Sequence, residues 1–451
     1  VEVDYEIDAS QTELSSSLDP TAPVVHPDLD SNLCFDWSLG DGARVDAVLA
    51  EAAHVVELDL IQNRVNASPM ETRGTVGFYE RGRDEYTLYT SNQNPHPIRV
   101  MLSASTMKIP EERIRVIARD VGGGFGMKIY HYNEEVLVLF AARRIDRPVR
   151  WIATRSEAFL ADTYARDHAT TVKLGLDADG TFLALKVDTI ANMGAYLHQV
   201  GPFVPRVGTS MSTGVYDIPV ADVRVRGVYT HTVPVDAYRG AGRPEAAYVI
   251  ERLVDEAARV MGMTPADMRR LNFVPPEKMP YETPTGRIYD SGEFAGHLDR
   301  ALEAADHAGF EGRVAESAAR GRIRGVGLTT YIEACAFPGG ETATVGLADD
   351  GIVTLLIGTQ SNGQGHATSY AQVMAETLGL DFELIKVFLR DTDRLDTCGG
   401  TGVSLSIPLL LPSLYFPSSH LSLLLKSFSA CLFVVVLSSP SPCARLFPFV
   451  S

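Results

Sequence analysis

A strand that runs directly into a glycine-rich loop is the feature that most limits what this chain can fold into. Residues 116–121 read Val-Ile-Ala-Arg-Asp-Val, and Gly122-Gly123-Gly124-Phe125-Gly126 follows them. Glycine adopts backbone conformations closed to other residues, so successive N–H groups in such a loop can face an anion or an oxo group. The loop is a candidate cofactor site, with a tight turn as the alternative. Met127 stands where both the dinucleotide fingerprint and the phosphate-loop pattern need glycine, so neither nucleotide motif is present.

Composition and charge narrow the class of protein. The 451 residues are 45% hydrophobic and 22% charged, the balance of a globular protein with sizeable cores. The formal net charge is −17, and no stripe of Lys and Arg with interleaved aromatic residues is present, so we expect no nucleic-acid partner. The five cysteines are scattered without a CxxC pair. This predicts a reducing compartment, without a disulfide framework or a cysteine-built metal site.

The composition changes abruptly at the end of the chain. From about Val403, Ser, Leu, Pro and Phe dominate, and only Lys426 and Arg445 are charged. We interpret residues 403–451 as foreign to the fold, produced by an unspliced intron or a frameshift. The alternative is a membrane anchor within 420–450, although Ser and Pro interrupt the roughly 20 apolar residues that a membrane helix needs. The opening residues VEVDYEI read as the middle of a strand, which predicts a fragment edge there.

Local patterns predict an α+β fold with no regular βαβ repeat. Apolar alternation around turn residues predicts strands over 171–176 and 182–189 and a second hairpin around Asp349-Asp350-Gly351. Helices are expected over the following ranges, with Asn133, Pro244 and Thr264 at the starts of the first three: 134–144, 245–261, the helix after 264–267, 294–305 and 368–378. We interpret Glu134 and Glu135 as acids that complement a helix start, and Asp167-His168 as structural.

Three further motifs accompany the glycine loop in a fixed order. They are Thr90-Ser91-Asn92-Gln93-Asn94-Pro95, Asp236-Ala237-Tyr238-Arg239-Gly240-Ala241-Gly242-Arg243 and Gly363-Gln364-Gly365-His366. Order and approximate spacing resemble those of the molybdenum hydroxylases, the family of xanthine dehydrogenase, aldehyde oxidase and aerobic carbon monoxide dehydrogenase large subunits. The resemblance also covers Pro69-Met70-Glu71, 147–151, 154–157 and 166–168, and so extends over nearly all of residues 1–402.

The resemblance implies a role for each motif. The family's molybdenum is held by the dithiolene of a pterin, so no side chain here ligates the metal directly. The Gln93 amide would donate to an oxygen on molybdenum, and the backbone of Gly123, Gly124, Phe125 and Gly126 would lie against the metal's apical side. Arg239 would be the catalytic-loop residue that steadies developing negative charge on the substrate side. Gly363, Gln364 and Gly365 would grip the pterin or its phosphates.

The resemblance also implies a multidomain organisation. Residues 1–20 would end an α/β hammerhead domain, 21–275 would form molybdopterin-binding domain 1, 276–309 a connector, and 310–402 the start of domain 2. The complete enzyme would be a cytoplasmic oxidoreductase that uses molybdopterin as a cytosine dinucleotide, with the cofactor lying between the two binding domains. Electrons would leave through [2Fe-2S] clusters to FAD. Because the chain lacks motifs for these centres, they would belong to separate subunits or to missing sequence; an iron–sulfur subunit and an FAD subunit are the expected partners, with no membrane partner.

Three departures from the family pattern limit the function. Gly240 occupies the position at which the molybdenum–copper enzymes carry the cysteine that holds Cu(I), which favours an aldehyde or N-heterocycle as substrate. Ile129 stands where purine-oxidising members place a glutamate. The family's general base is a glutamate near the C-terminus of a longer subunit, and it is absent from this chain. We therefore expect the chain by itself to be inactive. The alternative is that the chain has no function and is a truncated fragment or a gene-model artefact.

Overall fold

The computed structural model describes residues 2–335, 342–389, 391–395, 400–402, 406 and 434–438. The chain divides into two compact units, each made from two separate stretches of sequence. Unit 1 consists of Val1–Val65 and Thr163–Ala334, and unit 2 of Asn66–Asp162 and Cys335–Ser451. The predicted domains are continuous ranges of sequence, whereas these units are discontinuous, so the predicted boundaries stay a prediction.

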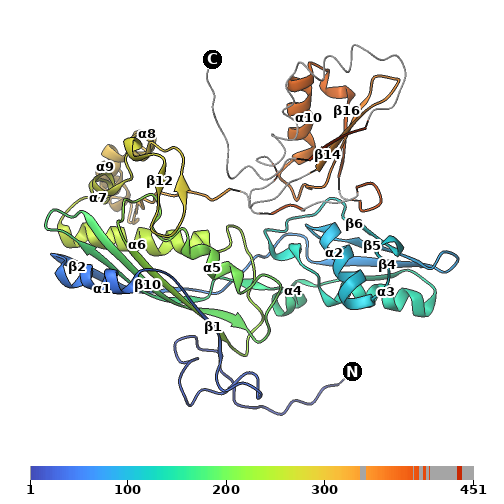
Figure 1. Cartoon of the computed structure of the whole chain (residues 1–451), viewed down its shortest axis with the longest axis horizontal. Coiled ribbons are helices and arrows are strands. Elements are labelled where there is room, and N and C mark those ends of the chain that lie inside the picture. The colour runs from blue at the N-terminus through green and yellow to red at the C-terminus, as the bar shows by residue number, and fades with distance from the viewer. Residues whose placement is uncertain are drawn as a thin grey trace. The chain divides into compact units, whose positions relative to one another are not determined.

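Unit 1 is built on a five-stranded mixed sheet covered by a helix on each face (Figure 1). The strand order is β1-β11-β10-β9-β2, with β1 at Leu33–Gly40, β11 at Ala221–Tyr229, β10 at Phe182–Gly194, β9 at His168–Leu176 and β2 at His54–Gln62. The antiparallel hairpin of β9 and β10 confirms the strands predicted over 171–176 and 182–189. Alternate residues of β10 point to opposite faces, so Leu185 joins one core and Ala184 the other.

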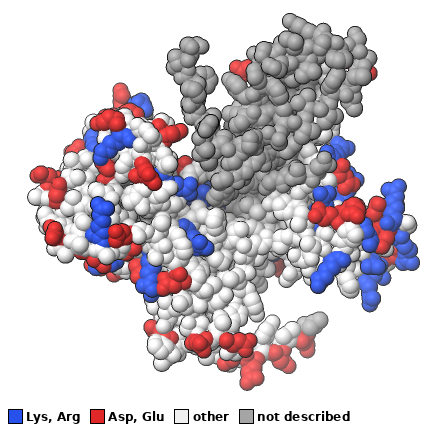
Figure 2. Space-filling view, viewed as in Figure 1, with Lys and Arg blue, Asp and Glu red and all other residues white. Residues whose placement is uncertain are grey.

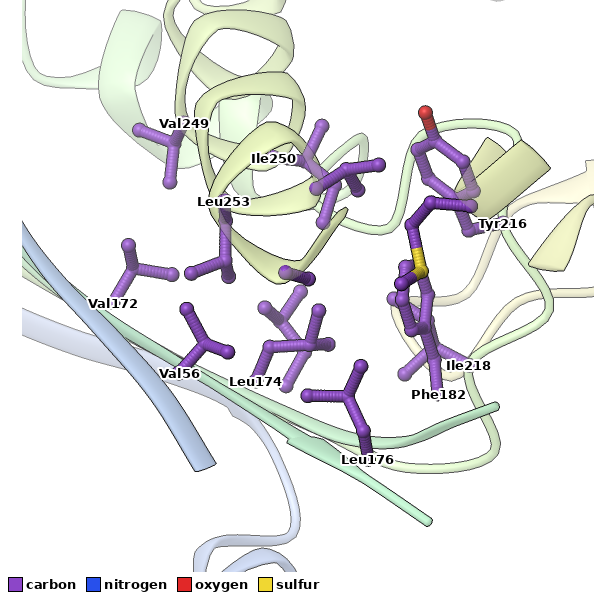
Figure 3. Packing of buried hydrophobic residues seen from close by; sticks show 14 of the residues in the cluster. Val56, Val172, Leu174, Leu176, Phe182, Tyr216, Ile218, Val249, Ile250 and Leu253 are labelled. Carbon is purple, nitrogen blue, oxygen red and sulfur yellow. The ribbon is translucent and has the colours of Figure 1, made fainter. Parts of the chain in front are cut away.

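Helix α6 (Arg243–Met261) covers the larger core of unit 1. Val249, Ile250 and Leu253 of this helix pack on Val172 and Leu174 of the sheet, and Figure 3 shows these side chains interdigitating. Helix α1 (Gly42–Glu51) covers the opposite face through Val45. Pro244 lies in the first turn of α6 as predicted, and Thr264 accepts a hydrogen bond from Asp267 N at the start of α7 (Pro265–Asn272), which confirms the predicted cap.

Unit 2 contains two four-stranded sheets. The first has the order β6-β5-β4-β7, with β6 at Ile114–Ile117, β5 at Glu85–Thr90, β4 at Gly74–Glu80 and β7 at Val149–Ile152; it packs against α2 (Pro95–Met101), η1 (Leu102–Met107) and α3 (Asn133–Ile145). The second has the order β16-β15-β14-β17, with β16 at Ile385–Leu389, β15 at Val353–Ile357, β14 at Thr342–Leu347 and β17 at Val434–Ser438, and α10 (His366–Leu378) packs on it. The β14–β15 pair confirms the hairpin predicted around Asp349-Asp350-Gly351.

The predicted α+β class is confirmed, and the sheets add a detail that the sequence patterns did not predict. Among the described residues, each of the three large sheets contains one parallel pair joined by a crossover that includes a helix: β10 with β11, β5 with β6, and β15 with β16. Strand β17 places residues 434–438 beside β14. The remaining elements are short: β3 Val65–Asn66, η2 Glu111–Arg113, η3 Met127–Ile129, α4 Arg155–Ala161, β8 Tyr164–Ala165, α5 Phe203–Thr209, η4 Pro276–Lys278, β12 Tyr281–Glu282, β13 Ile288–Tyr289, α8 Phe294–Ala304, η5 His307–Gly309, α9 Phe310–Ala318 and η6 Phe382–Leu384.

One predicted helix cap is wrong. The residue that precedes α3 is Tyr132, and Asn133 is already the first helical residue. The start of the helix is held instead by Glu135, whose carboxylate accepts a hydrogen bond from Tyr132 N at 3.2 Å. Glu134 and Glu135 both lie in the first turn of α3, which confirms their interpretation as acids at a helix start, and Glu134 also forms an ion pair with Arg73.

Candidate functional site

The glycine-rich loop follows β6 and is folded by its unusual backbone angles. Gly123, Phe125 and Gly126 have φ of 96°, 55° and 103°, in the left-handed region that glycine tolerates best. Phe125 is a non-glycine residue in this region, and its side chain is 41% exposed. A conformation of this kind needs support from outside the loop.

Two side chains from elsewhere in unit 2 hold the ends of the loop. The Glu71 carboxylate accepts a hydrogen bond from Gly122 N at 2.7 Å, and Gln93 Oε1 accepts one from Gly126 N at 2.9 Å. In the part of the chain that the structure describes, the amides of Gly123 and Gly124 have no hydrogen-bond acceptor. Two consecutive buried amides of the loop are therefore unpaired between two fixed ends, and consecutive unpaired amides of this kind can bind an anion or an oxo group.

Gln93 is buried beside this loop and is fixed at both ends of its amide. Its Nε2 donates to Thr401 O at 3.0 Å while its Oε1 accepts from Gly126. A Cβ on Gly124 would lie 2.3 Å from Gln93 Oε1, so only glycine allows the two to approach. The structure thus brings together Gln93 and the Gly122–Gly126 loop, two motifs that sequence analysis had singled out.

Thr401 connects Gln93 to the strand-end segment after β15. Its amide donates to Gln93 O at 3.1 Å, and its hydroxyl donates to Gln360 O at 2.7 Å. The Gln360 side chain is fully buried, its Nε2 donates to Asn92 O, and its Oε1 has no hydrogen-bond partner among the described residues. Sequence reasoning missed both Thr401 and Gln360.

The Gly363-Gln364-Gly365 loop lies at the start of α10. Gly363 and Gly365 have φ of 114° and 76°, and Ser361 Oγ accepts from both of their amides, at 3.4 and 3.0 Å. Gln364 Oε1 accepts from Asn362 N at 2.5 Å. The amides of Gly363 and Gly365 already have an acceptor within the loop, so donors to a ligand would come from Gln364 and from the first turn of α10. That this loop grips a cofactor stays a prediction.

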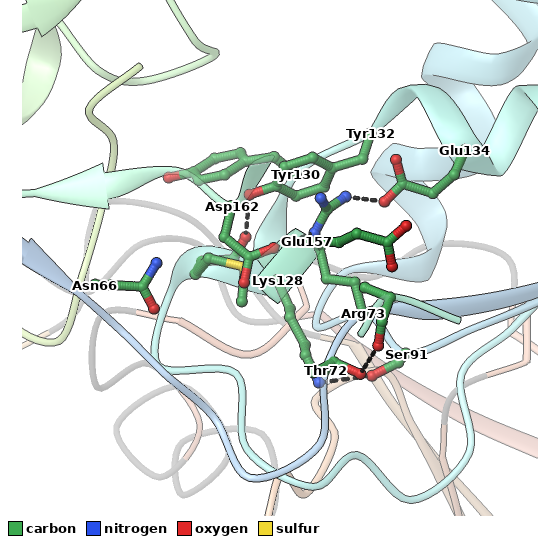
Figure 4. Close-up of polar contacts among 12 residues, drawn as sticks. Asn66, Thr72, Arg73, Ser91, Lys128, Tyr130, Tyr132, Glu134, Glu157 and Asp162 are labelled. Carbon is green, nitrogen blue, oxygen red and sulfur yellow. Dashed lines mark hydrogen bonds and ion pairs between the residues drawn. The ribbon is translucent and has the colours of Figure 1, made fainter. Parts of the chain in front are cut away.

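A cluster of charged side chains, several of them buried, includes the carboxylate that holds Gly122 N (Figure 4). Lys128 Nζ donates to the backbone oxygen and the carboxylate of Glu71, at 2.8 and 3.0 Å, and to Ser91 Oγ at 2.8 Å. Burial acts to raise the pKa of Glu71, but hydrogen bonds from Ser91 and Gly122 and the charge of Lys128 outweigh it, and the pKa lies below its usual value. The Glu71 carboxylate, which accepts the hydrogen bond from Gly122 N, is therefore ionised at neutral pH.

Arg73 occupies the centre of the same cluster. Its Nε donates to the fully buried Asp162 at 2.6 Å, it forms an ion pair with Glu134, and it lies 3.6 Å from the centre of the Tyr132 ring. Figure 4 shows the guanidinium between the two carboxylates. Each buried charge has an opposite partner, so the cluster is a structural base for the loop rather than a pair of catalytic acids.

Arg239 lies in unit 1, on the loop that leads into α6. The backbone angles φ of Gly240, Ala241 and Gly242 are 98°, 40° and 92°, so three consecutive residues are left-handed. Arg239 itself is exposed. Asp167 and His168 have structural contacts, as predicted: Asp167 pairs with Arg64 at 3.1 Å, and His168 is buried at the start of β9.

Other kinds of site have less support. Among the described residues, no group of three or more His, Cys, Asp and Glu side chains could hold a metal ion. No helix in that part of the chain is long and apolar enough to cross a membrane. Figure 2 shows Lys and Arg beside Asp and Glu over the face in view, rather than gathered into one basic patch.

Comparison with known proteins identifies the class. Residues 25–273 and residues 300–414 match the family described as Molybdopterin cofactor-binding domain. The second match runs past Gly402, where the composition changes. Both matched segments are therefore molybdopterin cofactor-binding domains. The chain belongs to the molybdenum hydroxylase family of oxidoreductases.

Several similar proteins are named as large chains or large subunits. The chain is 35% identical to the carbon monoxide dehydrogenase large chain of Hydrogenophaga pseudoflava, over 87% of this chain and 52% of that protein. It is 34% identical to the nicotine 6-hydroxylase large subunit of Paenarthrobacter nicotinovorans, over 78% of this chain and 44% of that protein. A crystal structure of Cu,Mo-CO dehydrogenase in the carbon monoxide reduced state superposes with a TM-score of 0.85 at 31% identity, covering 94% of this chain and 57% of that one. The chain thus spans about half the length of the curated relatives it matches.

Proposed function

We propose that this chain forms the molybdopterin-binding part of the large, catalytic subunit of a molybdenum hydroxylase. The enzyme would oxidise an aldehyde, an N-heterocycle or a similar small molecule with water as the oxygen source. The observation that carries the proposal is the pair of open amides at Gly123 and Gly124, held between Glu71 and Gln93. Within that organisation, 21–275 and 310–402 would belong to binding domains 1 and 2, and 1–20 to the hammerhead domain.

The residues present fit a molybdopterin cofactor. Gln93 uses one Nε2–H on Thr401 O, which leaves a second N–H for an oxygen of the metal centre. Gln360 Oε1 is a buried acceptor that lacks a donor among the described residues, and the pterin ring carries N–H donors. Once bound, the cofactor would supply the two-electron redox chemistry of a metal held by its own dithiolene. The protein's part is then to orient the cofactor and the substrate.

Each residue of the proposed site has a separate task. The amides of Gly123 and Gly124 would donate to an oxo group or an anion, and Gln93 would orient the oxygen that it touches. Residues Gly363, Gln364 and Gly365, at the start of α10, would bind the pterin or its phosphates. The exposed guanidinium of Arg239 would steady negative charge that develops on the substrate.

The geometry at Gly240 supports a copper-free enzyme. Its φ is 98°, and a Cβ at this position would lie 2.4 Å from Pro244 Cγ. A cysteine could not occupy this backbone without moving the loop, so a thiolate ligand for Cu(I) is disfavoured by shape as well as by identity. The relative named nicotine 6-hydroxylase large subunit is consistent with an N-heterocyclic substrate.

The proposal extends to the rest of the complex. Relatives of this chain are named as a large chain and a large subunit, which supports partner subunits for this chain. We propose an iron–sulfur subunit with [2Fe-2S] clusters and a subunit with FAD, a cytoplasmic location, and the cytosine dinucleotide form of the cofactor. An inactive fragment is the competing function, and it predicts a chain without molybdenum.

Metal and pterin analysis tests the proposal. The chain would be purified together with its partner subunits, then assayed for molybdenum by elemental analysis and for pterin by fluorescence after oxidation. We expect near-stoichiometric values in the wild type and a loss of at least about tenfold in Gln93→Met, because methionine cannot donate to an oxygen. Gln372→Met, on the exposed side of α10, is the matched control and should retain the cofactor. A wild type without molybdenum would support the inactive fragment.

A further inference from the structure

A half-buried arginine, Arg166, contacts the loop that carries Arg239. Arg166 Nη1 donates to Tyr238 O at 3.0 Å, and its Nη2 donates to Arg239 O at 3.0 Å. The same guanidinium lies 4.9 Å from the centre of the Tyr238 ring. One planar group therefore fixes two consecutive carbonyls of the loop, which is a geometry that a lysine ammonium cannot reproduce in full.

Glu245 completes the arrangement from the first turn of α6. Its Oε1 accepts from Arg166 Nη1 at 2.9 Å, and its Oε2 accepts from Gly242 N at 2.9 Å. Its own carbonyl accepts from Gln62 Nε2 at 2.7 Å. The carboxylate thus links the arginine that holds the start of the loop to the amide at its end.

A small pocket borders the end of the loop. Gly242 and Glu245 line it together with polar residues of the sheet, of α5 and of the segment after α5, namely Gln62, His168, Thr170, Thr189, Thr209 and Ser212. Gln62 Oε1 is buried and has no hydrogen-bond partner in the described part of the chain. Gly242 itself is closely packed, because a Cβ there would lie 2.3 Å from Val204 O, so the hydrogen bonds of Glu245 act on a backbone path that glycine permits.

Backbone strain gathers at the same place. Arg166 and Asp167 have φ of 62° and 67°, and Ala241 has φ of 40°, all left-handed without being glycine. Asp167 is held in place by Arg64 at 3.1 Å and by Asn192 at 2.8 Å. Strained residues persist only where the surroundings fix them, and they concentrate at sites whose geometry matters for function.

We propose that Arg166 and Glu245 are positioning residues that fix the backbone of residues 238–242 and so set where Arg239 stands. The inference rests on the proposed function for its catalytic consequence. The contacts are more than a surface salt bridge. The Arg166 and Glu245 side chains are only 15% and 5% exposed, and Arg166 donates two further hydrogen bonds to loop carbonyls.

Hydrogen exchange of the loop tests the positioning directly and needs no cofactor. In the purified chain, a peptide that spans 236–249 should exchange about tenfold faster in Arg166→Met, because hydrogen bonds to a charged group are lost. Arg166→Lys retains the charge and should fall between the wild type and Arg166→Met. Arg226→Met, which breaks the ion pair with Asp188 on the same sheet, is the control and should leave this peptide unchanged. Loop exchange within twofold of wild type in a folded Arg166→Met would overturn the proposal.

Turnover in the complete enzyme separates positioning from simple stability. In the subunit assembled with its partners, Arg166→Lys and Glu245→Gln should lower kcat by at least about tenfold while molybdenum content and Tm stay at wild-type values. Equal losses of Tm, molybdenum and activity would indicate a merely structural role and contradict the inference. If the wild type holds no molybdenum, the proposed function fails, and the exchange experiment still decides whether Arg166 fixes the loop.

Discussion

A buried ion pair joins Arg269 of α7 to Glu251 of α6 in unit 1. The two side chains are 0% and 7% exposed. Arg269 donates to Glu251 Oε2 at 3.1 and 2.7 Å and to Leu328 O at 2.9 Å. Arg269→Met would leave a buried carboxylate without its counter-ion. Breaking a buried pair by removal of one partner costs about 3–5 kcal/mol, and we expect this loss in the free energy of unfolding of unit 1.

The chain contains two tryptophans, one in each unit, and this makes the assay specific. Trp37 lies on β1 of unit 1, and Trp151 lies on β7 of unit 2. In a Trp151→Phe background, fluorescence during urea unfolding reports unit 1. With a slope of about 2 kcal/mol per M, Arg269→Met should lower the midpoint by about 2 M. In a Trp37→Phe background, the transition of unit 2 should not move.

A double variant tests the cause of the loss. Arg269→Met combined with Glu251→Met removes both charges, and Tyr216 OH keeps a partner in Thr330 Oγ1 at 2.9 Å. Replacement of a whole buried pair by apolar side chains is often neutral, so the double variant should regain much of the stability. A single variant that loses less than about 1 kcal/mol, or a double variant less stable than the single one, would refute the reasoning.

Three further predictions follow from individual residues. Burial lowers the pKa of His168 below 6.5 despite the nearby Glu245 and Asp167, so the unfolded chain takes up a proton that the folded chain does not. The free energy of unfolding is therefore not reduced by this histidine above pH about 6.5, and it falls by up to about 1.4 kcal/mol per pH unit below that pH. In His168→Gln, urea titrations at several pH values should show a smaller fall in the free energy of unfolding with decreasing pH. Gly124→Ala should reduce molybdenum content, because the new Cβ would meet the Gln93 amide, whereas Gly82→Ala meets nothing within 4 Å and should not. Gly312→Ala, in the exposed helix α9, should stabilise that helix by about 0.5–1 kcal/mol, and an unchanged or lower Tm would contradict this.

Local sequence patterns predicted helices and strands well where hydrophobic periodicity or a single residue at a helix start determines the element. The hairpin of β9 and β10 follows from apolar alternation on both sides of Asp177–Gly180, and the start of α6 follows from Pro244. The cap of α3 was missed because Glu135 reaches back to Tyr132 N, a contact that depends on the rotamer of one side chain. The parallel pairs were missed because strand order depends on crossover paths and not on local periodicity.

The candidate site was predictable only as far as its motifs extend along the chain. Gln93 and the glycine loop were both singled out, and the structure places them in contact. Thr401 was not, because the hydrogen bond from Gln93 Nε2 to its carbonyl joins residues 308 positions apart. Glu71 stands in a recognised segment, but nothing in the sequence indicates that its carboxylate holds Gly122 N.

Two loops, one in each unit, are held in the same way. In unit 2, side-chain oxygens of Glu71 and Gln93 accept the first and last amides of the glycine loop. In unit 1, Glu245 accepts the amide of Gly242, and Arg166 donates to the carbonyls before it. In each case the glycines permit the backbone path, and hydrogen bonds from polar side chains outside the loop select one conformation from those permitted. The residues that define such a loop therefore include the side chains that hydrogen-bond to its backbone. Substitution of one of these side chains should change the loop conformation, as substitution of a glycine would.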